Sequence, residues 1–212
     1  MAGVFISFEG GEGAGKSTQI ARLAEALRAA GREVVTTREP GGSALAEALR
    51  GVLLAGTLRG SGPVAEAYLF AAARLDHVET VIRPALARGA DVLCDRFVDS
   101  TRVYQGGEGG TPEETLAALE AYAVGTTMPR LTIVLDVPVG TGLARARARA
   151  GALDRFEGDA DAVHAARRRR FRMLAETEPD RCVLIDGSGA PDVVAAEIAR
   201  LVGQRLALPI GG

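Results

Sequence analysis

The residues best suited to chemistry lie in one short segment near the start of the chain, where glycines precede a lysine and a serine. The segment from Gly10 to Ser17 matches the pattern G-x-x-x-x-G-K-[ST] at every fixed position. Glycines let the backbone curl until successive N–H groups point at one anion, and a helix beginning near Lys16 adds its positive dipole end. Lys16 is expected to reach the β- and γ-phosphates of a nucleoside triphosphate, and the Ser17 hydroxyl to ligate Mg²⁺. The predicted ATP-binding residues of this loop are Gly10, Gly11, Glu12, Gly13, Ala14, Gly15, Lys16, Ser17 and Thr18.

A carboxylate near Ser17 would complete a magnesium site, and two predicted strands end in aspartate, at Asp95 and Asp136. Asp95 is followed at once by Arg96, which places a cation beside an anion at the ligand-binding edge of the sheet. Asp136 leads into a segment that only turns the chain. We therefore expect Asp95 to position the metal or its waters, with a helix cap or a structural ion pair to Arg96 as the alternative.

A second anion site is expected opposite the phosphate loop. Arg38 stands at the end of the second predicted strand, and the Pro-Gly-Gly turn after Glu39 fixes its approach to a phosphate. Arg74 lies four residues after Phe70 on a predicted helix, so both side chains leave the same face. A flat ring beside a forked donor suits a pyrimidine base, through stacking and through hydrogen bonds to a carbonyl edge. Phe70 could instead be an ordinary core residue.

The elements that must position these residues alternate between strands and helices along the chain. The pattern predicts a single α/β domain over residues 1–212, built on an open, doubly wound five-stranded parallel sheet with ligands at the carboxyl ends of the strands. The predicted strands are short, apolar and mostly β-branched, as strands buried on both faces should be. They are Val4–Phe8, Val34–Thr37, Val92–Cys94, Leu131–Leu135 and Cys182–Ile185.

Helices are predicted from apolar periodicity and from capping signals. The tetrapeptide Thr111-Pro112-Glu113-Glu114 combines a capping box with proline at the first helical position. Pro84 is expected to break a long helix over residues 64–87. The remaining predicted helices cover residues 16–30, 44–54 and 140–150, with a last one after Pro191.

Composition and charge exclude several classes of protein. The formal net charge of the 212 residues is −2, from 25 basic and 27 acidic side chains, so no global field attracts DNA or an anionic membrane. No apolar run reaches membrane-spanning length, and the N-terminus shows no signal peptide. Cys94 and Cys182 lack the spacing of a zinc or redox motif and are interpreted as buried strand residues. The sequence therefore predicts a cytoplasmic protein with no nucleic-acid or membrane partner.

A basic segment over residues 144–157 carries arginines at positions 145, 147, 149 and 155. Spacing by two scatters charges around a helix, which suits a mobile lid that closes over polyphosphate better than a ladder of surface ion pairs. An arginine supplied within the chain can accelerate phosphoryl transfer by about 10³-fold or more. An exposed basic helix is the alternative. The later arginine run over residues 167–170 is interpreted as a solvated or partly ion-paired helix without a site role.

Several motifs, in the same order and spacing, resemble the thymidylate kinase family in its bacterial type. The match covers about residues 4–157 and rests on Phe8-Glu9-Gly10, Arg38-Glu39-Pro40-Gly41-Gly42, Phe70-Ala71-Ala72-Ala73-Arg74, Asp95-Arg96-Phe97, Tyr104-Gln105-Gly106 and the arginine-rich lid. The resemblance implies a P-loop NTPase fold that makes dTDP from dTMP and ATP with Mg²⁺, usually as a homodimer. The resemblance also implies the contacts with dTMP. Phe70 would stack on thymine, Arg74 would bond the thymine carbonyl, and Ser100 or Thr101 would meet the edge of the base. Arg38 and Arg96 would hold the phosphate, Glu9 would lie near the sugar and the metal, and Tyr104 with Gln105 would crowd the ribose 2′ position.

In the implied reaction the attacking phosphate oxygen of dTMP is already largely ionised at neutral pH, so catalysis reduces to positioning and charge neutralisation. Gly13 stands where the eukaryotic type of the family carries an arginine, so the lid is expected to supply that charge. Arg102 departs from the family pattern and is expected to put a charge beside the nucleoside pocket. The expected catalytic residues are Lys16, Arg96, Arg147 and Arg149, with Arg145 in contact with ATP.

Two other interpretations stay open at this point. Another small kinase could act on dUMP, dCMP or a deoxynucleoside, although a neutral hydroxyl would need a carboxylate base, whereas Arg38 and Arg96 indicate an anionic acceptor. A nucleotide-dependent P-loop switch or binding module, which is a different class of protein, would lack the pyrimidine pocket.

Overall fold

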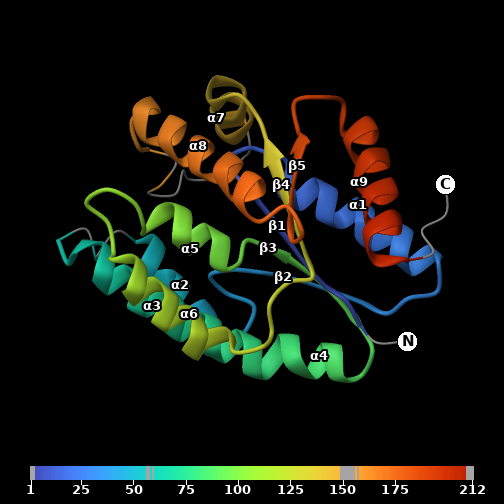
Figure 1. Cartoon of the computed structure of the whole chain (residues 1–212), viewed down its shortest axis with the longest axis horizontal. Coiled ribbons are helices and arrows are strands. Elements are labelled where there is room, and N and C mark those ends of the chain that lie inside the picture. Colours follow the sequence, from blue (N-terminus) through green and yellow to red (C-terminus); the bar gives the residue numbers. More distant parts are fainter. Residues whose placement is uncertain (1–2, 56–57, 59, 149–155, 157, 209–212) are drawn as a thin grey trace.

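The computed structural model describes residues 3–55, 58, 60–148, 156 and 158–208. Its centre is a five-stranded parallel sheet with the strand order β2-β3-β1-β4-β5 (Figure 1). The predicted sheet and its five strands are confirmed, and Cys94 and Cys182 lie buried in two of them. The strands are β1 (Phe5–Gly10), β2 (Val34–Arg38), β3 (Asp91–Asp95), β4 (Leu131–Asp136) and β5 (Cys182–Asp186).

The strand register brings the carboxyl ends of β1, β2 and β3 to one edge of the sheet. Arg38 on β2 pairs with Asp95 on β3, and Asp95 in turn pairs with Phe8 on β1. The phosphate loop leaves β1 at Gly10, only two residues further along. Residues that are far apart in the sequence therefore meet at this edge, where open parallel sheets bind their ligands.

Helices cover both faces of the sheet (Figure 1). α1 (Lys16–Ala29) and α9 (Pro191–Leu206) pack together over one face, and most of the other helices cover the second face. Neighbouring residues of β1 point to opposite sides, so Ile6 joins the core under α1 and α9 while Phe5 joins the second core. The remaining elements are α2 (Ala44–Leu54), α3 (Gly62–His77), η1 (Val78–Ile82), α4 (Arg83–Ala87), α5 (Val98–Tyr104), α6 (Glu113–Val124), α7 (Val139–Ala148) and α8 (Asp161–Thr177).

The long helix predicted over residues 64–87 is interrupted before Pro84. α3 ends at His77, a π-helical turn follows over η1, and α4 begins at Arg83. Proline has no backbone N–H to donate, and its ring crowds the preceding turn, so a wider turn accommodates it. The predicted break is confirmed, and it starts at Val78.

The capping box predicted at Thr111 is wrong. Pro112 lies at the N-cap with extended backbone, φ −53° and ψ 143°, and α6 begins one residue later, at Glu113. The Thr111 hydroxyl oxygen is buried and makes no hydrogen bond within the described part of the chain. The helix therefore starts without a side-chain cap, and Glu113 and Glu114 favour its first turn through the helix dipole.

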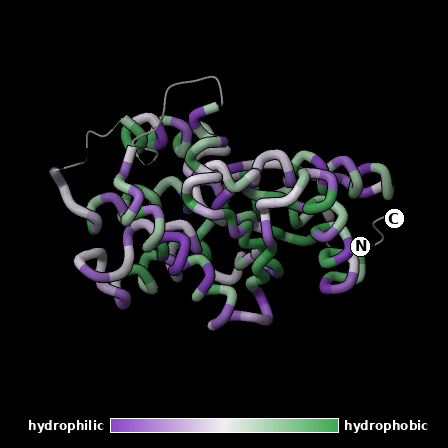
Figure 2. The backbone as a smooth tube through the Cα atoms, turned by 90° about the horizontal axis from the view of Figure 1, so that it is seen from above, coloured by the Kyte–Doolittle hydropathy of each residue, from purple (hydrophilic) through white to green (hydrophobic). Residues whose placement is uncertain are grey.

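Hydrophobic segments run through the middle of the molecule, where the strands lie, and hydrophilic segments are frequent at its outer turns (Figure 2). Among the described residues, no helix is both long enough and apolar enough to cross a bilayer.

Candidate active site

A cavity of about 760 Å³ opens at the carboxyl edge of β1, β2 and β3. It extends from the phosphate loop at one end to Phe70 and Arg74 at the other, and Arg38 and Arg96 also face it. Of the predicted site residues, Glu9, Gly10, Gly11 and Arg147 do not line it, and Arg149 lies outside the described residues. The predicted residues that do line the cavity are Glu12, Gly13, Ala14, Gly15, Lys16, Ser17, Thr18, Arg38, Phe70, Arg74, Asp95, Arg96, Ser100, Thr101, Tyr104, Gln105 and Arg145.

The phosphate loop follows β1 and runs directly into α1, which begins at Lys16. Gly15, at φ 94°, turns the chain into the helix through a left-handed conformation that side chains disfavour. The Lys16 ammonium donates to the carbonyl oxygens of Gly10 (3.2 Å) and Gly11 (3.1 Å), so its charge is held inside the loop. Burial, and then the nearby Arg96 charge, lower the pKa of Lys16. The first turn of α1 and this lysine together form a site for an anion.

Gly13 is the loop position where the chain contacts α7. A Cβ built at Gly13 would lie 1.9 Å from the carbonyl oxygen of Gly142, and its φ of 66° is itself left-handed. The reverse contact is also close, because a Cβ at Gly142 would lie 2.4 Å from the carbonyl oxygen of Glu12. The loop and the start of α7 therefore pack backbone against backbone.

Two hard oxygen atoms meet at the mouth of the loop. The Ser17 hydroxyl donates to Asp95 Oδ2 at 2.7 Å, and both residues line the cavity. Asp136, the other aspartate considered from the sequence, is held instead by Arg168 and Arg172, and the hydrogen bond from Arg168 is the main cause of its lowered pKa. Hydroxyl and carboxylate oxygens are ligands that Mg²⁺ prefers, so the pair Ser17 and Asp95 fits this cation.

Arg96 lies between the two ends of the cavity and connects them. Its guanidinium donates to the Gly10 carbonyl (3.1 Å), the Ser100 hydroxyl (3.1 Å) and Glu12 Oε1 (2.8 Å). The backbone of Arg96 is left-handed, at φ 68°, and the Cys94 thiol donates to its carbonyl oxygen at 3.0 Å. Asp95 is therefore not the hydrogen-bond partner of the Arg96 side chain, contrary to the alternative considered from the sequence.

Glu12 accepts from two residues of the cavity wall, Arg96 and the Tyr104 hydroxyl, the latter at 2.6 Å. Burial would raise the pKa of the Glu12 carboxyl, but the charges of Arg96 and Lys16 outweigh it and lower that pKa to about 2. Burial raises the pKa of the Tyr104 hydroxyl. At neutral pH the wall therefore carries an ionised Glu12 that accepts from a protonated Tyr104.

Arg74 is held rigidly at the far end of the cavity. Its Nε donates to Glu39 Oε2 (2.7 Å), and its Nη2 donates to the Phe97 carbonyl (3.1 Å) and to Thr101 Oγ1 (3.0 Å). The side chain is 4% exposed. Phe70 lines the cavity beside it and is not one of the buried core residues, so the structure does not support the core alternative.

Glu39 and Arg38 occupy consecutive positions with different surroundings. Glu39 is buried and bonds Arg74 and His77, whereas the Arg38 side chain is 55% exposed and pairs with Glu47 at 3.0 Å. Arg38 lines the cavity, so an anion entering there would meet a solvated arginine whose present partner lies at the surface.

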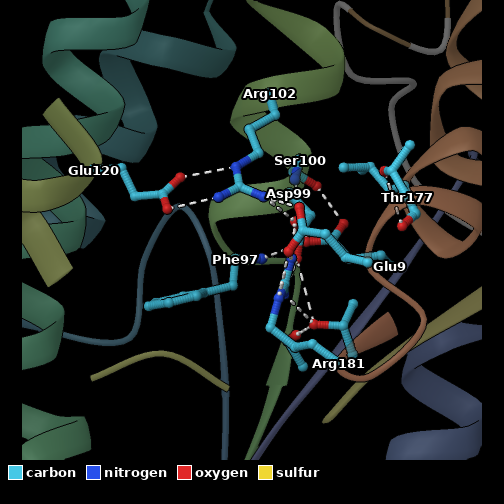
Figure 3. Close-up of polar contacts among 12 residues, drawn as sticks. Glu9, Phe97, Asp99, Ser100, Arg102, Glu120, Thr177 and Arg181 are labelled. Atoms are coloured by element: carbon cyan, nitrogen blue, oxygen red, sulfur yellow. Dashed lines mark hydrogen bonds and ion pairs between the residues drawn. The ribbon is translucent and has the colours of Figure 1, made fainter. Parts of the chain in front are cut away.

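Glu9 lies behind the cavity wall, fully buried beneath the start of α5 (Figure 3). Its carboxylate accepts from the backbone N–H groups of Phe97 (2.7 Å) and Ser100 (3.2 Å) and from the Ser100 hydroxyl (2.6 Å). Burial, and then the negative charge of Asp99, raise the pKa of Glu9 to about 7. Glu9 therefore contacts the helix that carries the cavity residues and does not face the cavity itself.

The raised pKa of Glu9 predicts a pH-dependent stability. Since the folded-state pKa of about 7 lies above the ordinary value of 4.5, the folded protein binds more protons, and ionising Glu9 costs stability as the pH rises between these values. Glu9→Gln should be more stable than wild type by about 1–3 kcal/mol at pH 8, with no such gain at pH 4.5. Urea unfolding at both pH values measures this. The exposed-loop variant Glu108→Gln should show no difference, and a gain for Glu9→Gln that does not vary with pH would contradict the assignment.

The lid is partly described. Arg145 on α7 lines the cavity and donates to the carbonyl oxygens of Gly187 (2.9 Å) and Ser188 (3.1 Å), so it joins the loop after β5 to the phosphate end. Arg147, also on α7, is exposed and does not line the cavity. Arg149 and Arg155 lie outside the described residues.

Arg102 does not put a charge beside the nucleoside pocket, so that expectation from the sequence is wrong. Its guanidinium points away from the cavity and binds Glu120 (2.7 and 2.8 Å) and Glu178 (2.7 Å), as Figure 3 shows for Glu120. On a helix, each residue is rotated by about 100° from the one before it, so Arg102 faces away from Thr101. It therefore braces α5 against its neighbours.

Several cavity residues were missed from the sequence. Glu39 could have been found as the carboxylate inside an Arg-Glu-Pro turn, and Phe156 as a rare aromatic beside the arginine-rich lid. Arg50 is one arginine on a helix with no distinguishing spacing, so no sequence signal would have found it. In the structure its Nη1 donates to the Pro40 carbonyl at 2.7 Å, and it lines the cavity.

The sheet order, the phosphate loop and the adjoining cavity define a P-loop NTPase fold. The chain matches the thymidylate kinase family model over residues 8–198. It therefore belongs to the thymidylate kinase family.

Individual relatives agree with this assignment. The chain is 56% identical over 206 residues to the thymidylate kinase of Caulobacter vibrioides, covering 97% of this chain and 99% of that one. It is 54% identical over 212 residues to the thymidylate kinase of Rhodopseudomonas palustris, covering 99% and 92%. A crystal structure of thymidylate kinase from Ehrlichia chaffeensis is similar with a TM-score of 0.75 and 30% identity, covering 95% of this chain and 99% of that one. The resemblance found in the motifs is confirmed.

Proposed function

We propose that this protein transfers the γ-phosphoryl group of ATP to the phosphate of dTMP. The single observation that supports this best is the continuous cavity that joins a triphosphate loop to a pocket of one aromatic ring and one rigid arginine. The loop accounts for ATP, and Phe70 with Arg74 accounts for a flat base with a carbonyl edge. Arg38 and Arg96 also line the cavity and would hold a monophosphate acceptor.

The residues of the chain bind, orient and neutralise charge, and none needs to act as a base. The acceptor phosphate has a second pKa near 6 and is largely ionised at neutral pH. Lys16 and Arg96 place cations at the two sides of the transfer, and Arg147 and Arg149 of the lid are proposed to add charge when the lid closes. Ser17 and Asp95 would hold Mg²⁺, which when bound neutralises the β- and γ-phosphates.

The nucleoside contacts follow from the cavity wall. Phe70 would stack on thymine, and Arg74, fixed by Glu39, would donate to its carbonyl. Ser100 and Thr101 line the cavity and would meet the base edge, and Tyr104 with Gln105 would form the wall against which the sugar lies. Arg145 and the loop after β5 are proposed to contact ATP.

A substrate panel tests the function. ADP release is measured with ATP and Mg²⁺ against dTMP, dUMP, dCMP and thymidine, and without an acceptor. We expect turnover with dTMP to exceed turnover with the other acceptors and to exceed the acceptor-free rate by orders of magnitude. Equal turnover with dCMP or thymidine would favour another small kinase, and hydrolysis without an acceptor would favour a P-loop switch.

Arg74→Ala should raise the KM for dTMP at least tenfold while the KM for ATP changes less than twofold. The Arg74 side chain is buried, with 4% of its surface exposed, and its removal leaves the polar wall of the cavity without this hydrogen-bond donor. Steady-state kinetics with each substrate varied in turn measure both constants. Arg28→Ala, on α1 away from the cavity, is the matched control and should leave both constants unchanged. An equal rise in the two constants would contradict the role given to Arg74.

We also infer a cytoplasmic homodimer. Two cysteines that are both free and buried suit a reducing compartment. Three adjacent helices, α2, α3 and α6, expose large apolar side chains, and a two-fold dimer can bury the same patch on both copies. This apolar face consists of Leu45, Val52, Val64, Tyr68, Leu75 and Tyr122.

Tyr122→Asp and Tyr68→Asp should each convert the dimer into a monomer, because each places a charge within the apolar face that the dimer would bury. Tyr122 is 85% exposed in the isolated chain, so neither change should prevent folding. Sedimentation equilibrium measures the mass. Val193→Asp, which is 67% exposed on α9, is the control and should stay dimeric. If both tyrosine variants sediment as dimers, the apolar face is not the interface.

A further inference from the structure

The arginine run on α8 does not form one solvated face. Arg168 turns to Asp136 at the end of β4, and Arg169 is exposed. Arg167 and Arg170 lie one turn apart and both reach the C-terminal end of α5, which packs beside α8 (Figure 1). That end of α5 carries Tyr104, and both Tyr104 and the next residue line the cavity.

Arg167 contacts aromatic rings more than it contacts polar groups. Its guanidinium carbon lies 4.4 Å from the centroid of the Tyr104 ring and 5.5 Å from that of Phe156, and these two rings meet edge to face at 5.3 Å. Nη2 donates to Asp159 at 2.6 Å, while Nη1 is buried without a hydrogen-bond partner among the described residues. The side chain is 11% exposed. A desolvated cation over an aromatic face holds that ring in place.

Arg170 holds the backbone around the same ring. Its Nη1 donates to the carbonyl oxygens of Val103 (2.9 Å) and Gly106 (2.8 Å). Carbonyl groups at the end of a helix have no partner inside the helix, so this arginine supplies one. Gly107 packs so closely against the guanidinium that a Cβ there would lie 1.9 Å from Nη2. Arg170 therefore fixes the chain on both sides of Tyr104 and Gln105.

The two arginines complete the support of one cavity wall. From the cavity side, Tyr104 donates to Glu12 at 2.6 Å, and Gln105 donates to Glu66 at 3.3 Å. From the α8 side, Arg167 covers the ring and Arg170 closes the helix end. A wall can exclude one additional hydroxyl group only if it does not move, because a displacement of about 1 Å is enough to change the fit of a substrate.

We propose that Arg167 and Arg170 are positioning residues for the wall formed by Tyr104 and Gln105, and that they set the discrimination between dTMP and its ribose analogue. The proposal rests on the proposed function of the cavity as the dTMP site. It gives a role to two arginines of a run that was interpreted from the sequence as a solvated or partly ion-paired helix without a site role, and it links α8 to the sugar end of the cavity.

The test compares Arg167→Ala, Arg167→Lys and Arg170→Ala with Arg169→Ala, which removes the same charge from an exposed position of the same helix. Kinetics are measured with dTMP and with the thymine ribonucleotide, and amide hydrogen exchange is followed over residues 103–107. We expect Arg167→Ala and Arg170→Ala to lower the deoxyribose-to-ribose ratio of kcat/KM about tenfold and to raise the KM for dTMP, with kcat and the KM for ATP changed less than twofold. Exchange over residues 103–107 should be faster, and Arg167→Lys should be intermediate.

The control Arg169→Ala should match wild type in every measurement. An unchanged ratio in both alanine variants, or the same loss in Arg169→Ala, would overturn the proposal. If wild type does not prefer dTMP, the proposed function fails, and the hydrogen-exchange data alone then test the positioning role. Unchanged exchange in the variants would overturn the positioning role, and faster exchange confined to the Arg167 and Arg170 variants would support it. Arg170→Lys replaces Arg170→Ala if the latter does not fold.

Discussion

Replacing Lys16 with methionine is expected to lower kcat for dTMP phosphorylation about a thousandfold. The Lys16 ammonium is held inside the phosphate loop by the carbonyl groups of Gly10 and Gly11, at the point where charge would develop on the transferring group. Removing one preorganised donor from such a site costs roughly 10²–10³ in kcat. Methionine keeps most of the length of the side chain and removes the ammonium group, with its charge and its hydrogen-bond donors. A coupled assay of ADP release at saturating ATP and dTMP measures the change.

Stability separates this loss from misfolding. Because burial lowers the pKa of Lys16, its charged form is not favoured by its surroundings, and Lys16→Met should melt no lower than wild type. Arg22→Met, on the same helix but exposed, should keep kcat within twofold. A kcat of Lys16→Met within tenfold of wild type would contradict the role of Lys16 in transfer.

Replacing Arg181 with methionine should produce the largest loss of stability, about 3–5 kcal/mol. Arg181 binds both carboxylate oxygens of Asp99 at 2.7 Å, and Asp99, in the first turn of α5, is fully buried (Figure 3). Without Arg181, the Asp99 carboxylate retains two weaker contacts, from Arg102 and from the Thr132 hydroxyl, each at 3.3 Å. The melting temperature should fall by roughly 10 °C. Thermal and urea unfolding measure the two quantities.

The control for Arg181 is an exposed ion pair. Arg88 and Glu33 are 49% and 57% exposed, so Arg88→Met should cost no more than about 1 kcal/mol. The double variant Asp99→Asn with Arg181→Met should recover part of the loss, because it removes the uncompensated charge. If Arg181→Met costs no more than Arg88→Met, the buried pair does not stabilise the fold.

The sheet could be predicted because its signals are local. Continuous β-branched runs mark strands buried on both faces, and the glycine pattern before Lys16 marks the loop that must follow the first of them. The start of α6 could not be predicted in the same way. Thr111 and Glu114 have the spacing of a capping box, yet Pro112 stays in extended backbone and the helix begins after it. The residues fit the capping-box pattern, but the extended backbone at Pro112 makes the helix begin at Glu113.

Ser17 and Asp95 could be predicted together although they are 78 residues apart, because one follows the glycine pattern and the other ends a strand of the same parallel sheet. Arg102 and Glu178 are 76 residues apart, and no motif around either residue indicates the pair. The arginines over residues 167–170 of α8 were not predicted either, because the four identical side chains have four different environments in the packed structure.

The backbone contact between Gly13 and Gly142 also limits how this chain can evolve. No side chain of any kind fits at either position without moving α7, so an arginine cannot replace Gly13 in the phosphate loop by a single substitution. The two ways of supplying charge to the transferring phosphate, from the loop or from the lid, are therefore separated by a low-fitness intermediate. A descendant of this protein could change from one to the other only after the contact with α7 had been rebuilt, so the order of mutations is constrained even though both endpoints can function.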